Sequence, residues 1–204
     1  SGSRVFVGGN AGVPYALIDD LIKHSKGFSD IELVHMLALG DTRWAKEEYR
    51  QLFKVNTFFI QGDEIRRAVD EGRADYTPVF LSEMSSLFSD GTLPLDAALV
   101  TVSPPDEFGY CSLGVSVDIS MSAVRNATIA IAQINPQMPR TAGHSFIHIS
   151  EFTACIEADE PLQAIEAPAI DSVTERQYTR CSFNISSKET TRFKKPSFRL
   201  KISL

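Results

Sequence analysis

The feature that most constrains this fold is the alternation of short apolar runs with amphipathic segments along the first 170 residues. The runs at 4–7, 95–102 and 128–134 are almost wholly apolar, which is typical of strands covered on both faces. The segment at 14–22 instead places its apolar residues at helical spacing. The pattern predicts an α/β fold, with an open, mostly parallel sheet and helices on both faces.

The same reading assigns the remaining elements by their apolar period. Further strands are expected at 31–37, 55–60 and 146–149, and further helices at 44–53, 62–72, 80–88 and 118–127.

Charge divides the chain near residue 170. Of 20 Lys or Arg and 26 Asp or Glu, eight basic and three acidic residues fall in 171–204, which leaves twelve and twenty-three in 1–170. Ala167-Pro168-Ala169 fits a boundary at this point. We expect an α/β domain at 1–170 and a basic, divergent tail at 171–204, either disordered or the stub of a missing second domain.

Composition argues against several classes of partner. The net charge of -6 disfavours a nucleic acid, and no stretch approaches the roughly 18 continuous apolar residues of a membrane span. Cys111, Cys155 and Cys181 are odd in number and have no metal-binding spacing, as expected of reduced thiols. We therefore expect a cytoplasmic protein with no metal, no membrane or nucleic-acid partner and no permanently bound cofactor.

The first candidate binding segment is Gly8-Gly9-Asn10-Ala11-Gly12, directly after the first apolar run. In an open α/β sheet the ligand lies beyond the carboxyl ends of the strands. Glycines in such a turn let the backbone approach a ligand and aim N–H groups at an anion. The spacing matches neither a dinucleotide fingerprint nor a Walker loop, so a tight turn that only packs helix on strand is the alternative.

The second candidate segment is the loop 103–114, which follows the run at 95–102. Pro104 and Pro105 make its start rigid and extended, and acids, hydroxyls and a thiol gather behind them. Stiff, polar loops of this kind often carry function. Nothing nearby in sequence supplies a base for Cys111, which we interpret as a small buried residue rather than a nucleophile.

The third candidate segment, 133–144, again joins a buried strand to amides and prolines. Arg140 is able to fork onto a carboxylate or phosphate, and His144 is able to shuttle a proton. The alternatives are a surface ion pair for Arg140 and a single backbone hydrogen bond for His144.

Several motifs also carry a family resemblance. They are Phe59-Ile60-Gln61-Gly62, the stretch from Arg67 to Glu83, Pro94-Leu95-Asp96, the loop 103–114, Gln133 to Arg140, and Ser145-Phe146-Ile147-His148. In this order they resemble the acetyl-CoA hydrolase/transferase family, and in particular its 4-hydroxybutyrate CoA-transferase branch. The resemblance runs from about Arg4 to Leu162. Phe108 departs from it, because family members often have histidine before that glycine.

The resemblance implies an enzyme that moves coenzyme A between an acyl-CoA, such as acetyl-CoA or 4-hydroxybutyryl-CoA, and a short carboxylic acid. In this family a glutamate attacks the acyl-CoA and passes through an acyl anhydride to a glutamyl-CoA thioester. Backbone N–H groups stabilise the oxyanions. The resemblance implies that this glutamate lies in a carboxyl-terminal domain, which we expect to be missing from the 204 residues. We therefore name no catalytic residue and expect the chain alone to be inactive.

By the same resemblance, this half would wall the acyl-substrate side of the active-site cleft. The expected substrate-binding residues are Gly9, Asn10, Ala11, Ser103, Pro104, Gly109, Tyr110, Ser112, Gln133 and Asn135.

Two other functions stay open. One is an acyl-CoA thioester hydrolase of the same family, which differs only in using water as the acceptor. The other is a non-catalytic binding or interaction half, because a domain face without its partner exposes apolar surface. We expect such a face to meet a catalytic domain or subunit, or another copy of the chain in a homo-oligomer.

Overall fold

The structure, a computed structural model, describes residues 2–164, so the predicted tail at 171–204 and Cys181 lie outside the described residues. The helices are α1 (Tyr15–Lys23), α2 (Asp63–Asp70), α3 (Leu81–Ser89) and α4 (Ser120–Asn126), with short 3-10 helices at Arg43–Ala45, Glu47–Tyr49 and Ile149–Glu151. The strands are β1 (Arg4–Val7), β2 (Ile31–His35), β3 (Phe53–Thr57), β4 (Ala74–Tyr76), β5 (Leu95–Val102), β6 (Tyr110–Ser112), β7 (Ala127–Ile134), β8 (Phe146–His148) and β9 (Ala154–Glu157).

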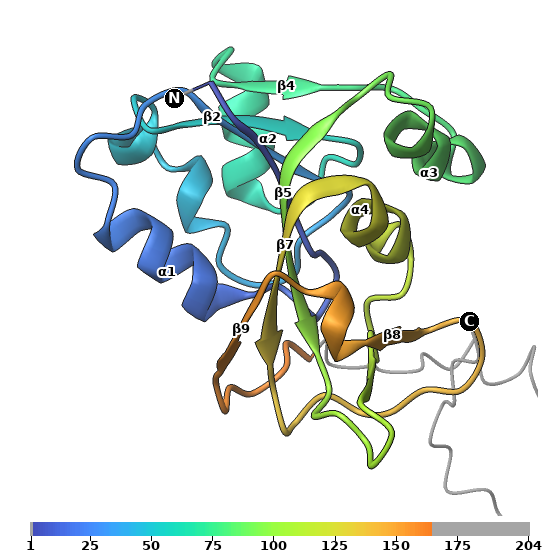
Figure 1. Cartoon of the computed structure of the whole chain (residues 1–204). Helices are drawn as coiled ribbons and strands as arrows, with labels where there is room; N and C mark the ends of the chain where they lie inside the picture. The colour runs from blue at the N-terminus through green and yellow to red at the C-terminus, as the bar shows by residue number, and fades with distance from the viewer. Residues whose placement is uncertain (1, 165–204) are drawn as a thin grey trace, which may run out of the picture. The chain divides into compact units, whose positions relative to one another are not determined.

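Seven of these strands form one parallel sheet in the order β4-β3-β2-β1-β5-β7-β9 (Figure 1). The strands β6 and β8 form a separate antiparallel pair beyond the end of β5. The expected open parallel sheet is confirmed. None of the helices in the described part of the chain is long and apolar enough to cross a membrane.

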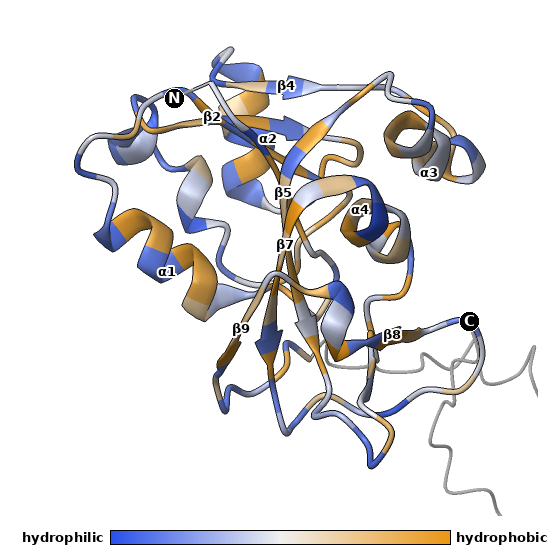
Figure 2. Cartoon of the chain, viewed as in Figure 1, coloured by the Kyte–Doolittle hydropathy of each residue, from blue (hydrophilic) through white to orange (hydrophobic). Residues whose placement is uncertain are grey.

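Two hydrophobic cores cover the two faces of the sheet, because successive side chains of a strand point to opposite faces. On β1, Phe6 enters the core shared with α3 and α4, whereas Val5 and Val7 enter the core shared with α1 and α2. On β5, Val100 and Leu99 divide in the same way. Figure 1 shows the two helix layers on either side of the strands, and Figure 2 shows α1 banded between hydrophobic and hydrophilic residues.

One expected element was wrong. The segment at 44–53 is not a continuous helix, because Lys46 is extended (φ -68°, ψ 150°) and separates the two 3-10 helices there. The first of them buries Trp44 to 1% exposure. The short strands β4, β6 and β9 were not predicted, since three or four residues give too little apolar period to recognise.

Candidate functional site

The three candidate segments meet at one edge of the sheet. β1, β5 and β7 are parallel neighbours, with Val7 opposite Leu99 and Val102 opposite Ile134. The segments that follow these strands therefore leave the sheet at its carboxyl edge, where ligands bind in open α/β folds. The chain order alone did not guarantee this neighbourhood, since β2, β3 and β4 come between β1 and β5 in sequence.

Ser116 and Met138 join the three segments side by side. The Ser116 hydroxyl donates a hydrogen bond to the Gly9 carbonyl at 2.8 Å, and the Val115 N–H points at the Met138 sulfur at 3.4 Å. A β-carbon at Gly12 would lie 2.9 Å from Ser116 Cβ and 3.3 Å from the Met138 methyl. Gly12 therefore has to be glycine for the three segments to pack this closely.

The first segment has backbone N–H groups at this edge without a partner among the described residues. Asn10 is in the left-handed region (φ 54°). Its N–H donates to the Leu37 carbonyl at 2.8 Å, and its carbonyl accepts from the Leu39 N–H at 3.1 Å, so both backbone groups are bonded to the segment after β2. Among the described residues, nothing accepts a hydrogen bond from the N–H of Gly9 or Ala11. Backbone donors left unpaired in this way are able to bind an anionic oxygen.

The side chain of Asn10 is held by a residue that the sequence analysis did not single out. Its Nδ2 donates to Asp118 Oδ2 at 2.7 Å, across 108 positions of sequence. The other oxygen of Asp118 accepts from the N–H groups of Ile119 and Ser120 at 2.6 and 3.1 Å, at the start of α4. Asp118 lies two residues before α4, and an aspartate near a helix start is a capping signal, so the sequence held a sign of its structural role but not of its contact with Asn10.

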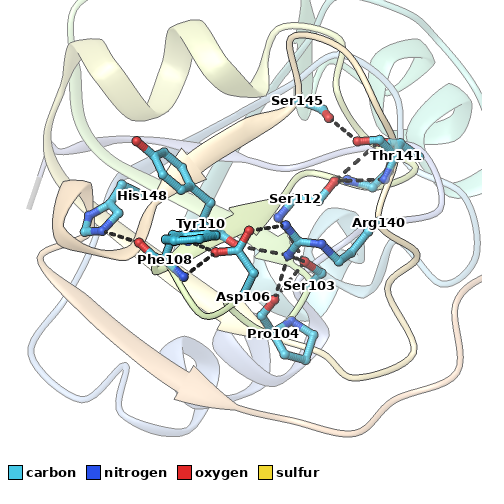
Figure 3. A network of polar contacts seen from close by, with 11 residues as sticks. Ser103, Pro104, Asp106, Phe108, Tyr110, Ser112, Arg140, Thr141, Ser145 and His148 are labelled. Atoms are coloured by element: carbon cyan, nitrogen blue, oxygen red, sulfur yellow. Dashed lines mark hydrogen bonds and ion pairs between the residues drawn. The ribbon is translucent and has the colours of Figure 1, made fainter.

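The second segment is closed on itself by Arg140. The guanidinium donates to the carbonyls of Pro104 and Tyr110 at 3.1 and 2.9 Å, to Ser103 Oγ at 3.3 Å, and to Asp106 Oδ2 at 2.9 Å (Figure 3). Arg140 therefore pairs through one nitrogen with a carboxylate of its own chain, which is the ion-pair alternative. We call this set the arginine clamp: Arg140 with Ser103, Pro104, Asp106 and Tyr110.

Backbone N–H groups complete the clamp from the other side. Those of Tyr110 and Phe108 donate to Asp106 Oδ1 at 2.8 and 3.0 Å. The N–H of Tyr110, with that of Phe108 and the nearby Arg140, holds the pKa of the Asp106 carboxyl below its usual value. Ser103 Oγ accepts from the Ser112 N–H at 2.9 Å. The side chains of Ser103 and Ser112 are both fully buried.

His148 supports the outer bend of this segment. Its Nδ1 accepts from the Ser150 N–H at 3.2 Å, so its Nε2 carries the proton that reaches the Phe108 carbonyl at 3.1 Å. A β-carbon at Gly109 (φ 84°) would lie 2.6 Å from His148 Nε2. The exposed ring of Tyr110 lies edge-on to His148, and with Asp106 and Phe146 it lines an open hollow of about 230 Å³.

The third segment is also occupied by internal bonds. Gln133 Oε1 accepts from the Ala16 N–H in the first turn of α1 at 3.1 Å, and its Nε2 donates to Glu160 at 2.8 Å. Asn135 Nδ2 donates to the Glu160 carbonyl at 2.8 Å, while its Oδ1 accepts from the Gln137 N–H at 2.9 Å. Both side chains are about 1% exposed. They fix the turn and the start of α1.

Buried polar groups with no partner among the described residues lie at the end of β2 and in the 3-10 helix at Arg43–Ala45. His35, at the end of β2, is fully buried, and neither ring nitrogen has a hydrogen-bond partner among the described residues. The Trp44 Nε1–H beside it is likewise unpaired within the described chain, with the two rings 6.0 Å apart. Burial lowers the pKa of His35 to about 4, so the ring is neutral at pH 7.

Cys111 is fully buried in the core with α3 and α4, and burial raises the pKa of its thiol to about 11. A thiol held in its neutral form is a poor nucleophile. This agrees with the interpretation of Cys111 as a packing residue. In residues 2–164, no group of three or more His, Cys, Asp or Glu side chains is arranged to hold a metal ion.

The structure thus sorts the ten predicted binding residues into two groups. Asn10, Ala11, Pro104, Gly109 and Tyr110 are at least partly accessible at the carboxyl edge. The others, Gly9, Ser103, Ser112, Gln133 and Asn135, are buried. Their role in binding stays a prediction. The four polar side chains among them would contribute by holding the accessible residues in position.

An α/β domain whose three polar segments converge beyond the sheet defines a class of ligand-binding folds, and comparison with known proteins gives the family. Residues 1–176 match the model of the acetyl-CoA hydrolase/transferase N-terminal domain. The chain belongs to this family.

Individual relatives agree with this assignment. The chain is 40% identical over 188 residues to the 4-hydroxybutyrate coenzyme A transferase of Clostridium kluyveri, which covers 92% of this chain and 44% of that protein. It is 42% identical over 162 residues to the succinyl-CoA:acetate/propanoyl-CoA:succinate CoA transferase of Fasciola hepatica, covering 78% of this chain and 33% of that protein. The crystal structure of 4-hydroxybutyrate CoA-transferase from Porphyromonas gingivalis matches with a TM-score of 0.67 and 32% identity, over 82% of this chain and 38% of that one. The chain therefore spans less than half the length of these relatives.

Proposed function

We propose that this chain is the acyl-substrate half of a CoA-transferase that moves coenzyme A between an acyl-CoA and a short carboxylic acid. The proposed partner is a carboxyl-terminal half, as a domain or a separate subunit, that supplies the nucleophilic glutamate. The similarity to 4-hydroxybutyrate and succinyl-CoA transferases supports coenzyme A thioesters as the substrate class.

The observation that carries this proposal is the set of polar groups at Gly9, Asn10 and Ala11 that have no partner among the described residues. They lie at the carboxyl edge between β2 and β5, where a ligand faces the sheet. Two unpaired backbone N–H groups fit the oxygen of a thioester or carboxylate. The neighbouring segments are bonded internally and supply a rigid wall beside them.

The proposed reaction has two covalent stages on the glutamate of the other half. The carboxylate attacks the thioester carbonyl, the C–S bond breaks, and an acyl-glutamyl anhydride and CoA thiolate form. The thiolate then attacks the glutamyl carbonyl and releases the first carboxylic acid as its carboxylate, leaving a glutamyl-CoA thioester. The acceptor carboxylate takes coenzyme A by the reverse steps. This chain's part is to orient the acyl group and its oxygen.

A complementation experiment tests the proposal. The chain is co-expressed with the remaining, carboxyl-terminal part of the C. kluyveri enzyme, and 4-hydroxybutyryl-CoA formation from acetyl-CoA and 4-hydroxybutyrate is measured. We expect turnover only when both halves are present. Turnover by the purified chain alone, or a stable assembly of both halves without any transfer, would contradict the proposal.

Thioester hydrolysis is the second candidate, because the matching family is named for both activities. The same assembly separates them when products are analysed with and without an acceptor acid. A transferase forms free coenzyme A slowly when no acceptor is present. A hydrolase releases it at the same rate in both conditions.

A further inference from the structure

The last described residues, 158–164, form a strap along the carboxyl edge of the sheet (orange, after β9 in Figure 1). The strap starts at the end of β7, where the Ala158 N–H donates to the Ile134 carbonyl at 3.0 Å. Its far end reaches the segment after β2, because a β-carbon at Gly40 would lie 2.7 Å from the Gln163 side chain. In the order of the sheet, β5 and β1 lie between these two points. The strap therefore passes β1, from which the first candidate segment leaves the sheet.

A pair of side chains latches the strap to α1. Gln133, near the end of β7, donates from Nε2 to Glu160 Oε2 at 2.8 Å and accepts at Oε1 from the Ala16 N–H at 3.1 Å. The Glu160 carbonyl also accepts from Asn135 Nδ2 at 2.8 Å, so residue 160 is held through its side chain and its backbone. Ala16 lies in the first turn of α1, the helix into which the first candidate segment leads. The latch therefore joins the strap to that end of the segment.

The far end of the strap lies beside the contact that holds Asn10. A β-carbon at Gly40 would also lie 2.6 Å from the Tyr15 hydroxyl. This hydroxyl donates to the Leu39 carbonyl at 2.8 Å, and the Leu39 N–H donates to the Asn10 carbonyl at 3.1 Å. The strap and the first turn of α1 thus enclose Gly40 and, through Leu39, fix the backbone of Asn10.

We infer that Gln133 and Glu160 are positioning residues, which hold the first candidate segment in place by latching the strap. With the latch closed, the N–H groups of Gly9 and Ala11 stay where they meet the oxygen of the substrate. This inference rests on the proposed function. Backbone donors stabilise an oxyanion only at hydrogen-bond distance, and a displacement of about 1 Å is enough to lower a rate by about a hundredfold.

The latch is broken by Gln133→Glu and restored by a second substitution. In Gln133→Glu, one carboxylate oxygen keeps the bond from the Ala16 N–H, but the other meets the carboxylate of Glu160, and two acceptors of like charge repel each other. The half-buried Glu160 then moves away with the strap. Glu160→Gln alone keeps the contact, because its amide oxygen accepts from Gln133. The double variant Gln133→Glu with Glu160→Gln forms the same bond with donor and acceptor exchanged.

Backbone amide shifts of the ¹⁵N-labelled 204-residue chain report on the latch without any substrate. We expect Gln133→Glu to shift the amides at 9–12 and 39–40, the double variant to return them, and Glu160→Gln to leave them nearly unchanged. Glu160→Ala removes the contact from its half-buried side and should shift the same amides, so it replaces Gln133→Glu if that variant does not fold. Glu157→Ala, on an exposed residue of β9, is the matched control and should shift neither set.

Turnover gives the second measurement, in the assembly of the chain with the carboxyl-terminal part of the C. kluyveri enzyme. We expect Gln133→Glu and Glu160→Ala to lower kcat by about tenfold or more and to change the KM for acetyl-CoA much less, because displaced donors fail most where charge develops in the transition state. The double variant should recover most of the loss. Glu157→Ala should keep the full rate.

The outcomes separate the two proposals. Shifts confined to 158–164, with none at 9–12, overturn the inference, because a strap with only a structural role behaves in this way. A double variant that fails to return the shifts, or a full kcat in both broken variants, also overturns it. Absence of transfer with the unmodified chain overturns the proposed function instead, while the amide shifts still decide whether the latch positions the first candidate segment.

Discussion

Two regions at the same edge of the sheet use their polar residues in opposite ways. In the first segment, the backbone N–H groups of Gly9 and Ala11 and the oxygen of Asn10 have no partner among the described residues. In the arginine clamp, Arg140 alone occupies acceptors from four residues. Density of polar residues in sequence is therefore a poor guide to a site. What matters is which polar groups remain after the internal bonds are counted.

The comparison also separates rigidity from recognition. The chain that follows the clamped loop contacts both neighbouring segments, because the Ser116 hydroxyl donates to the Gly9 carbonyl and the Val115 N–H points at the Met138 sulfur. A rigid neighbour keeps the open groups in place without consuming them, which lowers the entropic cost of ordering the site on binding. We expect substitutions in the clamp to act mainly on stability and those in the open turn mainly on binding.

The largest effect is expected from Gly9→Ala. A β-carbon there would lie 2.3 Å from the backbone oxygen of Leu37, which cannot move without breaking its bond to Asn10. We expect a loss of about 3 kcal/mol or more in the free energy of unfolding, measured by urea denaturation. Gly8→Ala, where the closest contact is 3.3 Å, is the matched control and should cost much less. Equal losses would contradict the close approach of β2's extension at Gly9.

Acid should lower the free energy of unfolding through the buried His35. Burial lowers the pKa of His35 to about 4. As the pH falls below about 6.5, the imidazole therefore binds a proton in the unfolded chain but stays neutral in the folded one. The stabilisation is complete above pH 6.5 and declines as the pH falls toward 4, by about 3 kcal/mol in all. Urea denaturation between pH 7.5 and 4.5 measures it. His35→Phe should flatten this slope, whereas the exposed His24→Gln should not; an unchanged slope in His35→Phe would contradict the assignment.

Removing the clamp should cost less, because Arg140 is partly exposed and its ion pair is screened. We expect Arg140→Met to lower the free energy of unfolding by about 2 kcal/mol, mostly through lost bonds to the carbonyls of Pro104 and Tyr110. Arg66→Met, on the exposed side of α2, is the control. In the assembled protein we expect the KM for the acid to change little; a KM raised by tenfold or more would place Arg140 in the site after all.

The smallest effect on stability is expected from Asn10→Gly. Glycine relieves the left-handed backbone strain while losing the bond to Asp118, so the free energy of unfolding should change by less than about 1 kcal/mol. The transfer rate of the assembled protein should nevertheless fall by about tenfold or more, since the side-chain amide at the edge is gone. A variant that keeps full activity would remove Asn10 from the site.

Much of this fold could be predicted from sequence, because long apolar strands have a clear pattern. The strand at Leu95–Val102 was placed to the residue, and the helices at 14–22 and 62–72 were displaced by a residue or two. The expected helix at 44–53 failed because periodicity does not reveal one extended residue such as Lys46.

The candidate site was less predictable. Convergence of the three segments followed from the rule that ligands lie at the carboxyl edge, and the structure has them there. Which polar groups are bonded internally and which have no partner could not be predicted. Hydrogen bonds such as that from Asn10 to Asp118 or from Arg140 to Asp106 join residues far apart in sequence. The spacing of neighbouring residues in the sequence does not predict such pairs.

The most direct test of the account is to map ligand contacts on the chain itself. The ¹⁵N-labelled protein is titrated with 4-hydroxybutyrate, and the shifts of the backbone amides at 9–11 are compared with those at 103–112. The account predicts saturable shifts that are largest at Gly9 and Ala11, whose N–H groups are unpaired within the described chain. Shifts concentrated in 103–112, with none at 9–11, would contradict it.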